Sequence, residues 1–200
     1  LGMLPQRGDV VLADRLIHAS MVAGILRSGA RLRRFPHNDL HALNAMLAEE
    51  TGRQGRVGNP LPAAGLGDDG AQGNARPTNI SGAPSAIFVV TESIFSMDGD
   101  GPDLVAMAQL HEEFEFFWVL DEAHATGWFG ETGAGALEAQ GCLGMPDLLV
   151  STLGKALGAS GGYVCGSRVL IDFLVNRARS FIFSTAPVPA AAAAAMAGVQ

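Results

Sequence analysis

Short apolar runs recur along the chain and are separated by longer segments with a different spacing. The runs cover residues 10–13, 86–91, 116–120, 148–151 and 163–166. The most apolar of them are nearly continuous, without the polar–apolar alternation of a half-exposed strand. Continuous runs of this length are typical of strands in a sheet whose two faces are both covered. The pattern therefore predicts five strands, the most apolar of them buried.

The segments between these runs carry apolar residues at helical spacing. The positions that define two helices are Leu104, Met107, Leu110 and Phe114, and then Leu170, Phe173, Leu174 and Arg177. Asp39 is placed to cap a third helix, which begins at Leu40. The alanine run 190–195 follows Pro187 and Pro189 and predicts a fourth. Alternation of strands and helices predicts an α/β fold, a mostly parallel sheet with helices on both faces.

Residues 51–85 interrupt this alternation. They are rich in Gly, Pro, Asn and Asp and show no periodicity, so they predict a long surface loop or a disordered insertion. A boundary between two domains is the alternative. The apolar runs on either side look like strands of one sheet, which favours an insertion.

Composition limits the class of protein. The 200 residues are 48% hydrophobic and 16% charged, as in globular proteins, and no apolar run reaches the length of a membrane span. The net charge of −7 disfavours nucleic acid and anionic membranes as partners. Neither Cys142 nor Cys165 has a second Cys or His at the spacing of a metal site, so we expect reduced core thiols and no metal site. No targeting segment is visible and we expect a cytoplasmic protein, although a chain that begins at Leu1 leaves an organelle open.

Polar residues that carry chemistry follow two of the predicted strands. The run 116–120 ends in Asp121 and Glu122, with His124 close behind, at the strand end where open α/β sheets bind ligands. A carboxylate there would favour a neighbouring cation, and a helix or turn cap is the alternative. The run 148–151 leads into Gly154 and Lys155. We expect partial desolvation to make this amine nucleophilic, and a surface lysine on a turn is the alternative.

Two further loops follow strands. Ser96, Asp98 and Asp100 surround Gly99 after the run 86–91, without the ligand spacing of a calcium-binding EF-hand. His18 lies just beyond the run 10–13. Together with the two preceding segments, these loops form a combination that is far more specific than any one of them.

The combination resembles the α-oxoamine synthase family, pyridoxal 5'-phosphate (PLP) enzymes of the aspartate aminotransferase fold type. The matching stretches, in the order of the family, are His18-Ala19-Ser20, His37-Asn38-Asp39, Ser96-Met97-Asp98-Gly99-Asp100, Asp121-Glu122-Ala123-His124, Thr152-Leu153-Gly154-Lys155 and Phe183-Ser184-Thr185-Ala186. The resemblance implies that residues 1–200 are the central part of a PLP-binding large domain. An N-terminal arm and a C-terminal small domain would then lie outside the chain.

The resemblance also implies roles for single residues. Lys155 would hold PLP as a Schiff base and move protons at the substrate α-carbon, Asp121 would pair with the pyridinium nitrogen, and His18 would stack on the ring. His124 and Ser96 would lie near the phenolic oxygen and Thr152 near the phosphate. Ser184 and Thr185 would reach the phosphate of a neighbouring subunit, which implies a homodimer with shared active sites.

The implied reaction joins an amino acid to an acyl thioester, carried by CoA or by a carrier protein. It loses carbon dioxide, except in the branch that joins glycine to acetyl-CoA. The motifs most favour the branch that condenses L-alanine with a pimeloyl thioester for biotin synthesis. Phe95 and Ala123 stand where 5-aminolevulinate synthases usually carry His and Val. A glycine C-acetyltransferase stays open. A non-catalytic partner subunit or an inactive fragment is the alternative outside enzymes, and the presence of Lys155, Asp121 and His18 argues against the partner subunit.

Overall fold

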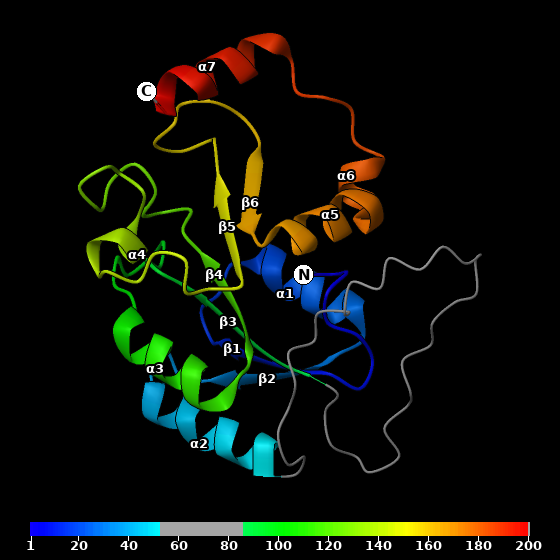
Figure 1. The fold of residues 1–200 in the computed structure, drawn as a ribbon, viewed down its shortest axis with the longest axis vertical. Helices are drawn as coiled ribbons and strands as arrows, with labels where there is room; N and C mark the ends of the chain where they lie inside the picture. The colour runs from blue at the N-terminus through cyan, green and yellow to red at the C-terminus, as the bar shows by residue number, and fades with distance from the viewer. Residues whose placement is uncertain (53–85, 200) are drawn as a thin grey trace.

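The apolar runs of the sequence form the strands of one six-stranded sheet. The computed structural model describes residues 1–52 and 86–199 (Figure 1). The strands are β1 (Val10–Asp14), β2 (Arg31–Phe35), β3 (Ile87–Glu92), β4 (Phe117–Asp121), β5 (Leu148–Thr152) and β6 (Gly162–Gly166). They lie in the order β2-β1-β3-β4-β5-β6, with β1 to β5 parallel and β6 antiparallel to β5. The five predicted strands are confirmed to within one residue at either end.

Strand β2 was not predicted, because its sequence carries three arginines and only Phe35 is buried. It lies at the edge of the sheet, where exposed charged side chains are tolerated. Arg31 donates to the buried carboxylate of Glu50 at 2.6 Å, and Arg33 contacts both Glu49 and Glu50. These pairs join β2 to the following helix, so its order depends on contacts that an apolar pattern does not record.

Helices follow most strands. They are α1 (Ala19–Ser28), α2 (Leu40–Gly52), α3 (Leu104–Phe114), α4 (Ala136–Ala139), α5 (Arg168–Arg177), α6 (Arg179–Ile182) and α7 (Pro189–Val199). The four predicted helices are confirmed as α2, α3, α5 and α7, and Asp39 caps α2 by accepting from the Ala42 N–H at 2.8 Å. Helices α1, α4 and α6 were missed. Within the described ranges, no helix is long and apolar enough to cross a membrane.

The sheet is covered on both faces, as predicted. One core packs α2, α3 and α4 against Leu12, Val89 and Trp118. The other packs α1 and α5 against the alternate strand positions, among them Val11 and Val119. Figure 1 shows α2 and α3 on one side of the strands and α1 on the other. Because the central strands β1, β3 and β4 are buried, we expect a binding site at the strand ends.

Two expectations from the sequence need adjustment. The predicted insertion begins too early, because Thr51 and Gly52 belong to α2, and residues 53–85 lie outside the described residues. Both cysteines are free as expected, but only Cys142 is in the core, since Cys165 is exposed on β6. The division into domains stays a prediction.

The parallel strands end at one edge of the sheet. Asp14, Glu92, Asp121 and Thr152 are the last residues of β1, β3, β4 and β5. The chain passes from β1 to its neighbour β2 and then returns to the other side of β1 to form β3. Open α/β sheets bind ligands at such a reversal, beyond the carboxyl ends of the strands. This edge is therefore where the candidate site lies.

Candidate active site

Asp121 ends β4 as a half-buried carboxylate. Its Oδ1 accepts a hydrogen bond from the Ala123 N–H at 2.8 Å. Burial raises the pKa of Asp121, and that hydrogen bond offsets the effect only in part. The charge of Lys155, and those of His18 and His124 when they are protonated, act in the same lowering direction. These four groups are therefore close enough to interact electrostatically.

Lys155 lies on the turn after β5, and its amine points at His124. The Nζ–Nε2 distance is 2.9 Å. Burial and the neighbouring ammonium both lower the pKa of His124, which favours a neutral imidazole that accepts from Lys155. Lys155 itself is exposed, so the expectation of a desolvated amine is wrong for the described residues. The lysine is held by a partner rather than by burial.

His18 lies at the start of α1, where its ring is exposed. Its Nδ1 accepts from the Ser20 N–H at 3.3 Å and contacts the Ser20 Oγ at 2.7 Å, so the side chain acts as the N-cap of the helix. The backbone of His18 lies close enough to Glu92 to act on the pKa of that carboxyl in the lowering direction. The ring is thus held through its Nδ1 while the residue remains exposed.

Glu92 is a site residue to which the sequence analysis gave no role. It pairs with Asp121 in the register of β3 and β4 and is 4% exposed. Burial, followed by the charge of Asp121, raises the pKa of Glu92 to about 7. The signal in the sequence was a carboxylate at the end of an apolar strand, the same signal that marked Asp121.

The remaining predicted site residues are less closely joined. Thr152 ends β5, where its Oγ1 donates to the Gly161 carbonyl at 3.0 Å and accepts from the Gly154 N–H at 3.1 Å, which shapes the turn that carries Lys155. Ser96 is exposed in the turn after β3. Ser184 and Thr185 are exposed beyond α6, and the hydroxyl of Ser184 contacts only the Thr185 carbonyl, at 3.4 Å, within the described chain. The structure brings together Lys155, Asp121, His18 and His124.

Comparison with known sequences identifies the family. Residues 2–200 match the family described as aminotransferase class I and II. The chain belongs to this family. Proteins named 8-amino-7-oxononanoate synthase from Geotalea daltonii and Geobacter sulfurreducens are each 41% identical to this chain, over 191 and 202 residues respectively. The predicted resemblance to α-oxoamine synthases is confirmed.

These alignments cover 96% and 100% of this chain but 41% and 44% of the two relatives. The chain thus spans less than half the length of the curated relatives it matches.

Solved structures agree with the family. A serine palmitoyltransferase from S. paucimobilis with a bound PLP–myriocin aldimine superposes with a TM-score of 0.77 and 29% identity, covering 99% of this chain and 43% of that one. An 8-amino-7-oxononanoate synthase from Francisella tularensis superposes with a TM-score of 0.69 and 27% identity, covering 99% of this chain and 48% of that one. The predicted fold class is confirmed.

In this aminotransferase-family chain, Glu122 fixes the turn that follows Asp121. It is fully buried and accepts from the Leu137 N–H at 2.8 Å, the Ala136 N–H at 3.0 Å and the Ser93 Oγ at 2.9 Å. Gly135 has φ +118°, and a Cβ there would lie 2.5 Å from a Glu122 carboxylate oxygen. The carboxylate therefore ties the start of α4 to the end of β4.

Glu122→Gln is expected to lower the free energy of unfolding by about 2 kcal/mol. The substituted amide nitrogen must face N–H or O–H donors on one side, and at least one buried donor loses its acceptor. Urea unfolding at pH 7 measures the loss, with Glu113→Gln on the exposed side of α3 as the control. Equal stability of the two variants would contradict this role for Glu122.

Glu92→Gln is expected to flatten the pH dependence of stability in the cofactor-free protein. A carboxyl whose folded-state pKa is raised to about 7 stabilises the fold at low pH and loses that contribution as pH rises from its unfolded-state value toward 7. The variant should match the parent near pH 4.5 and exceed it at pH 8 by on the order of 1 kcal/mol. Urea unfolding at both pH values tests this, and a parent stability that rises over the interval relative to the variant would refute it.

Two other features do not serve as the site. A cavity of about 640 Å³ lies at the opposite edge of the sheet, lined by Phe117, Cys165, Leu170 and others, and its carboxylate Asp147 already accepts from the Trp118 N–H. Ligand atoms of His37, Asp98 and Asp100 lie within 4.8 Å of one another, the one grouping of this kind among the described residues. Both ring nitrogens of His37 face carboxylates as hydrogen-bond partners, so neither offers a free lone pair to a metal ion.

Proposed function

We propose that this chain carries the PLP site of an α-oxoamine synthase that condenses L-alanine with a pimeloyl thioester, as an 8-amino-7-oxononanoate synthase. The observation that carries the proposal is the meeting of an amine, a half-buried carboxylate and two imidazoles at the carboxyl ends of β1, β4 and β5. The relatives that are 41% identical support the choice of substrate branch.

The residues present fit PLP. Asp121 uses one oxygen for the Ala123 N–H, and no described protein group donates a hydrogen bond to the other. Its raised pKa reflects a carboxylate that burial destabilises, and a protonated ring nitrogen is a cation that would restore the charged form. Lys155 is exposed, so an aldehyde can reach its amine, and the exposed ring of His18 offers an aromatic face.

When bound, PLP supplies an electron sink for the pair of electrons left at the substrate α-carbon. Lys155 would hold the cofactor and, once the substrate amine has displaced it, would take and return the proton at that carbon. Neutral His124 accepts a hydrogen bond from the amine and would orient it. Asp121 would keep the ring nitrogen protonated, and His18 would pack on the ring face. Ser96 and Thr152 would donate to the phenolic oxygen and the phosphate.

We also propose a homodimer with shared active sites. Ser184 and Thr185 lie on an exposed segment beyond α6, and Phe181 and Phe183 beside them are 63% and 73% exposed. Apolar side chains gathered on one exposed segment are typical of an interface. Sedimentation of the protein from the complete reading frame gives the oligomeric state.

The reaction is tested with protein expressed from the complete reading frame. Pimeloyl thioester and L-alanine should together release carbon dioxide and CoA or free carrier protein, and neither substrate alone should do so. Release with glycine and acetyl-CoA only would overturn the proposed substrates and indicate a glycine C-acetyltransferase. Absence of PLP binding would overturn the proposal as a whole.

A further inference from the structure

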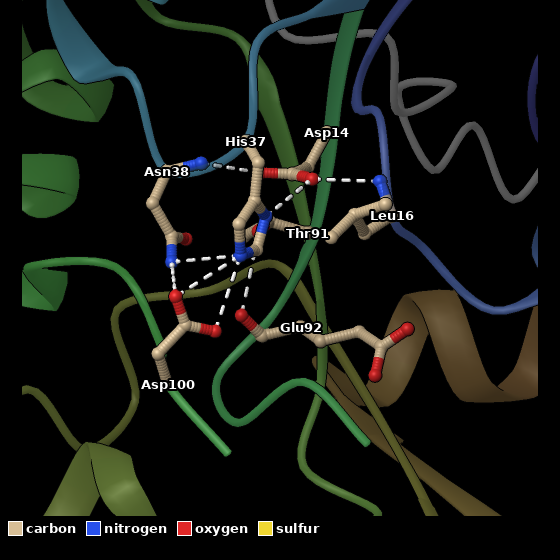
Figure 2. A network of polar contacts seen from close by, with 7 residues as sticks. All are labelled: Asp14, Leu16, His37, Asn38, Thr91, Glu92 and Asp100. Atoms are coloured by element: carbon tan, nitrogen blue, oxygen red, sulfur yellow. Dashed lines mark hydrogen bonds and ion pairs between the residues drawn. The ribbon is translucent and has the colours of Figure 1, made fainter. Parts of the chain in front are cut away.

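His37 lies between two carboxylates that come from the two sides of the chain reversal at β1. Its Nδ1 is 3.0 Å from Asp14 Oδ1, and its Nε2 is 3.1 Å from both carboxylate oxygens of Asp100 (Figure 2). Asp14 ends β1, and Asp100 closes the turn after β3. Both ring nitrogens can donate at once only in the imidazolium form. The imidazolium side chain of His37 thus joins two loops that lie 86 residues apart in the sequence, and beside it the Asn38 Nδ2 donates to Asp100 Oδ2 at 3.0 Å.

On one side, Asp14 organises the segment that leads to His18. The carboxylate is fully buried and accepts from the Leu16 N–H and the Asn38 N–H, each at 2.8 Å. Asn38 adopts a left-handed φ of 54°, which aims its backbone N–H at Asp14. Figure 2 shows Leu16 and Asn38 meeting at Asp14 from two different segments, one after β1 and one after β2. His37 therefore contacts the anchor of the segment that places the His18 ring.

On the other side, Asp100 closes the turn that carries Ser96. The Phe95 N–H donates to the Asp100 carbonyl at 2.8 Å, and the Gly99 N–H donates to the Phe95 carbonyl at 2.9 Å. The Phe95 ring is buried and meets the His37 ring edge-on, with centroids 4.4 Å apart. Within the described chain, Ser96 itself has no hydrogen bond that would hold it, so its position depends on this closed turn.

We propose that His37 is a positioning residue, which holds the 95–100 turn against the end of β1 and thereby sets Ser96 relative to the cofactor. This role rests on the proposed PLP site, and it adds a residue to which the resemblance assigned no task. The hydrogen bonds to Asp14 and Asp100 outweigh the effect of burial and raise the pKa of His37, in keeping with a cation shared by two carboxylates. The Glu92 carboxylate points away from His37, Asp14 and Asp100, so it is not part of this network (Figure 2).

The first test needs no cofactor. His37→Phe keeps a ring against Phe95 and removes both hydrogen bonds, while His37→Asn keeps one donor. In protein from the complete reading frame, hydrogen exchange of residues 95–100 should rise about tenfold in His37→Phe and less in His37→Asn. The β4 amides should be unchanged, as should all amides in His41→Asn, a control at an exposed histidine one helical turn away. Unchanged exchange in the 95–100 turn, or an equal rise in β4, would overturn the proposal.

The second test asks whether His37 acts through Ser96. His37→Phe and Ser96→Ala should each raise the PLP dissociation constant about tenfold. The double variant should raise it by no more than about tenfold, because the two substitutions remove the same contact. Multiplied effects, near a hundredfold, would show an independent and merely structural role for His37. If the parent protein binds no PLP, the proposed function fails, and the exchange experiment alone decides whether His37 holds the turn.

Discussion

Lys155→Ala is expected to lower kcat/KM by about a thousandfold or more, because the variant loses both the covalent attachment of PLP and the base that moves the α-carbon proton. Lys155 is the only lysine in the 200 residues. Borohydride treatment of the parent should therefore fix the cofactor on a single peptide of this chain. The variant should lose that label, and it should also lose the absorbance of the lysine–PLP Schiff base near the edge of the visible range.

Lys155→Arg is the matched control. Arginine keeps a positive charge near His124 and Asp121 but forms no Schiff base, so it should be as inactive as the alanine variant. Since Lys155 is exposed, both variants should keep the parent free energy of unfolding to within about 0.5 kcal/mol. Full activity of Lys155→Ala would revive the interpretation of this chain as a non-catalytic partner subunit.

The sequence predicted the elements whose order depends on burial alone. Strands β1, β3, β4 and β5 are continuous apolar runs because both faces of the sheet are covered. Strand β2 was not predicted, because Arg31 and Arg33 pair with Glu49 and Glu50 of α2. These partners are distant along the chain, so no local sequence pattern indicates the pairing. Helix α1 escaped because its N-cap is a histidine, a residue outside the usual capping set.

The site was predicted in the same uneven way. Asp121, His124, Lys155 and His18 were marked by their places after strands, and parallel strands bring such residues to one edge. Glu92 also lies at the end of a strand, but its proximity to the site became evident only from the β3–β4 register, which places it opposite Asp121. His37 lies after the unpredicted strand β2, so its link to Asp100 had no signal in the local sequence. The exposure of Lys155 was also beyond local reasoning, since it depends on which segments cover the turn.

Asp121→Asn is the second variant for which we expect a large effect, about a hundredfold or more in kcat/KM. Asparagine keeps the size of the side chain and an oxygen for the Ala123 N–H, but it cannot hold a proton on the ring nitrogen by charge. Steady-state kinetics should show the loss mainly in kcat, since the substrate contacts remain. The pKa of His124 should fall further in the variant, because in the parent protein the charge of Asp121 raises that pKa.

Stability separates this functional role from a structural one. Burial raises the pKa of Asp121, so the charged carboxylate destabilises the cofactor-free fold as pH rises above its unfolded-state pKa. At pH 8 the cofactor-free Asp121→Asn protein should therefore be at least as stable as the parent, while the holoenzyme is far less active. Such a split is typical of a charge kept for chemistry at the expense of stability. Asp98→Asn, at an exposed aspartate of the 95–100 turn, controls for the loss of one negative charge. An Asp121→Asn protein that keeps parent activity, or that unfolds in urea well before the parent at pH 8, would remove Asp121 from the proposed site.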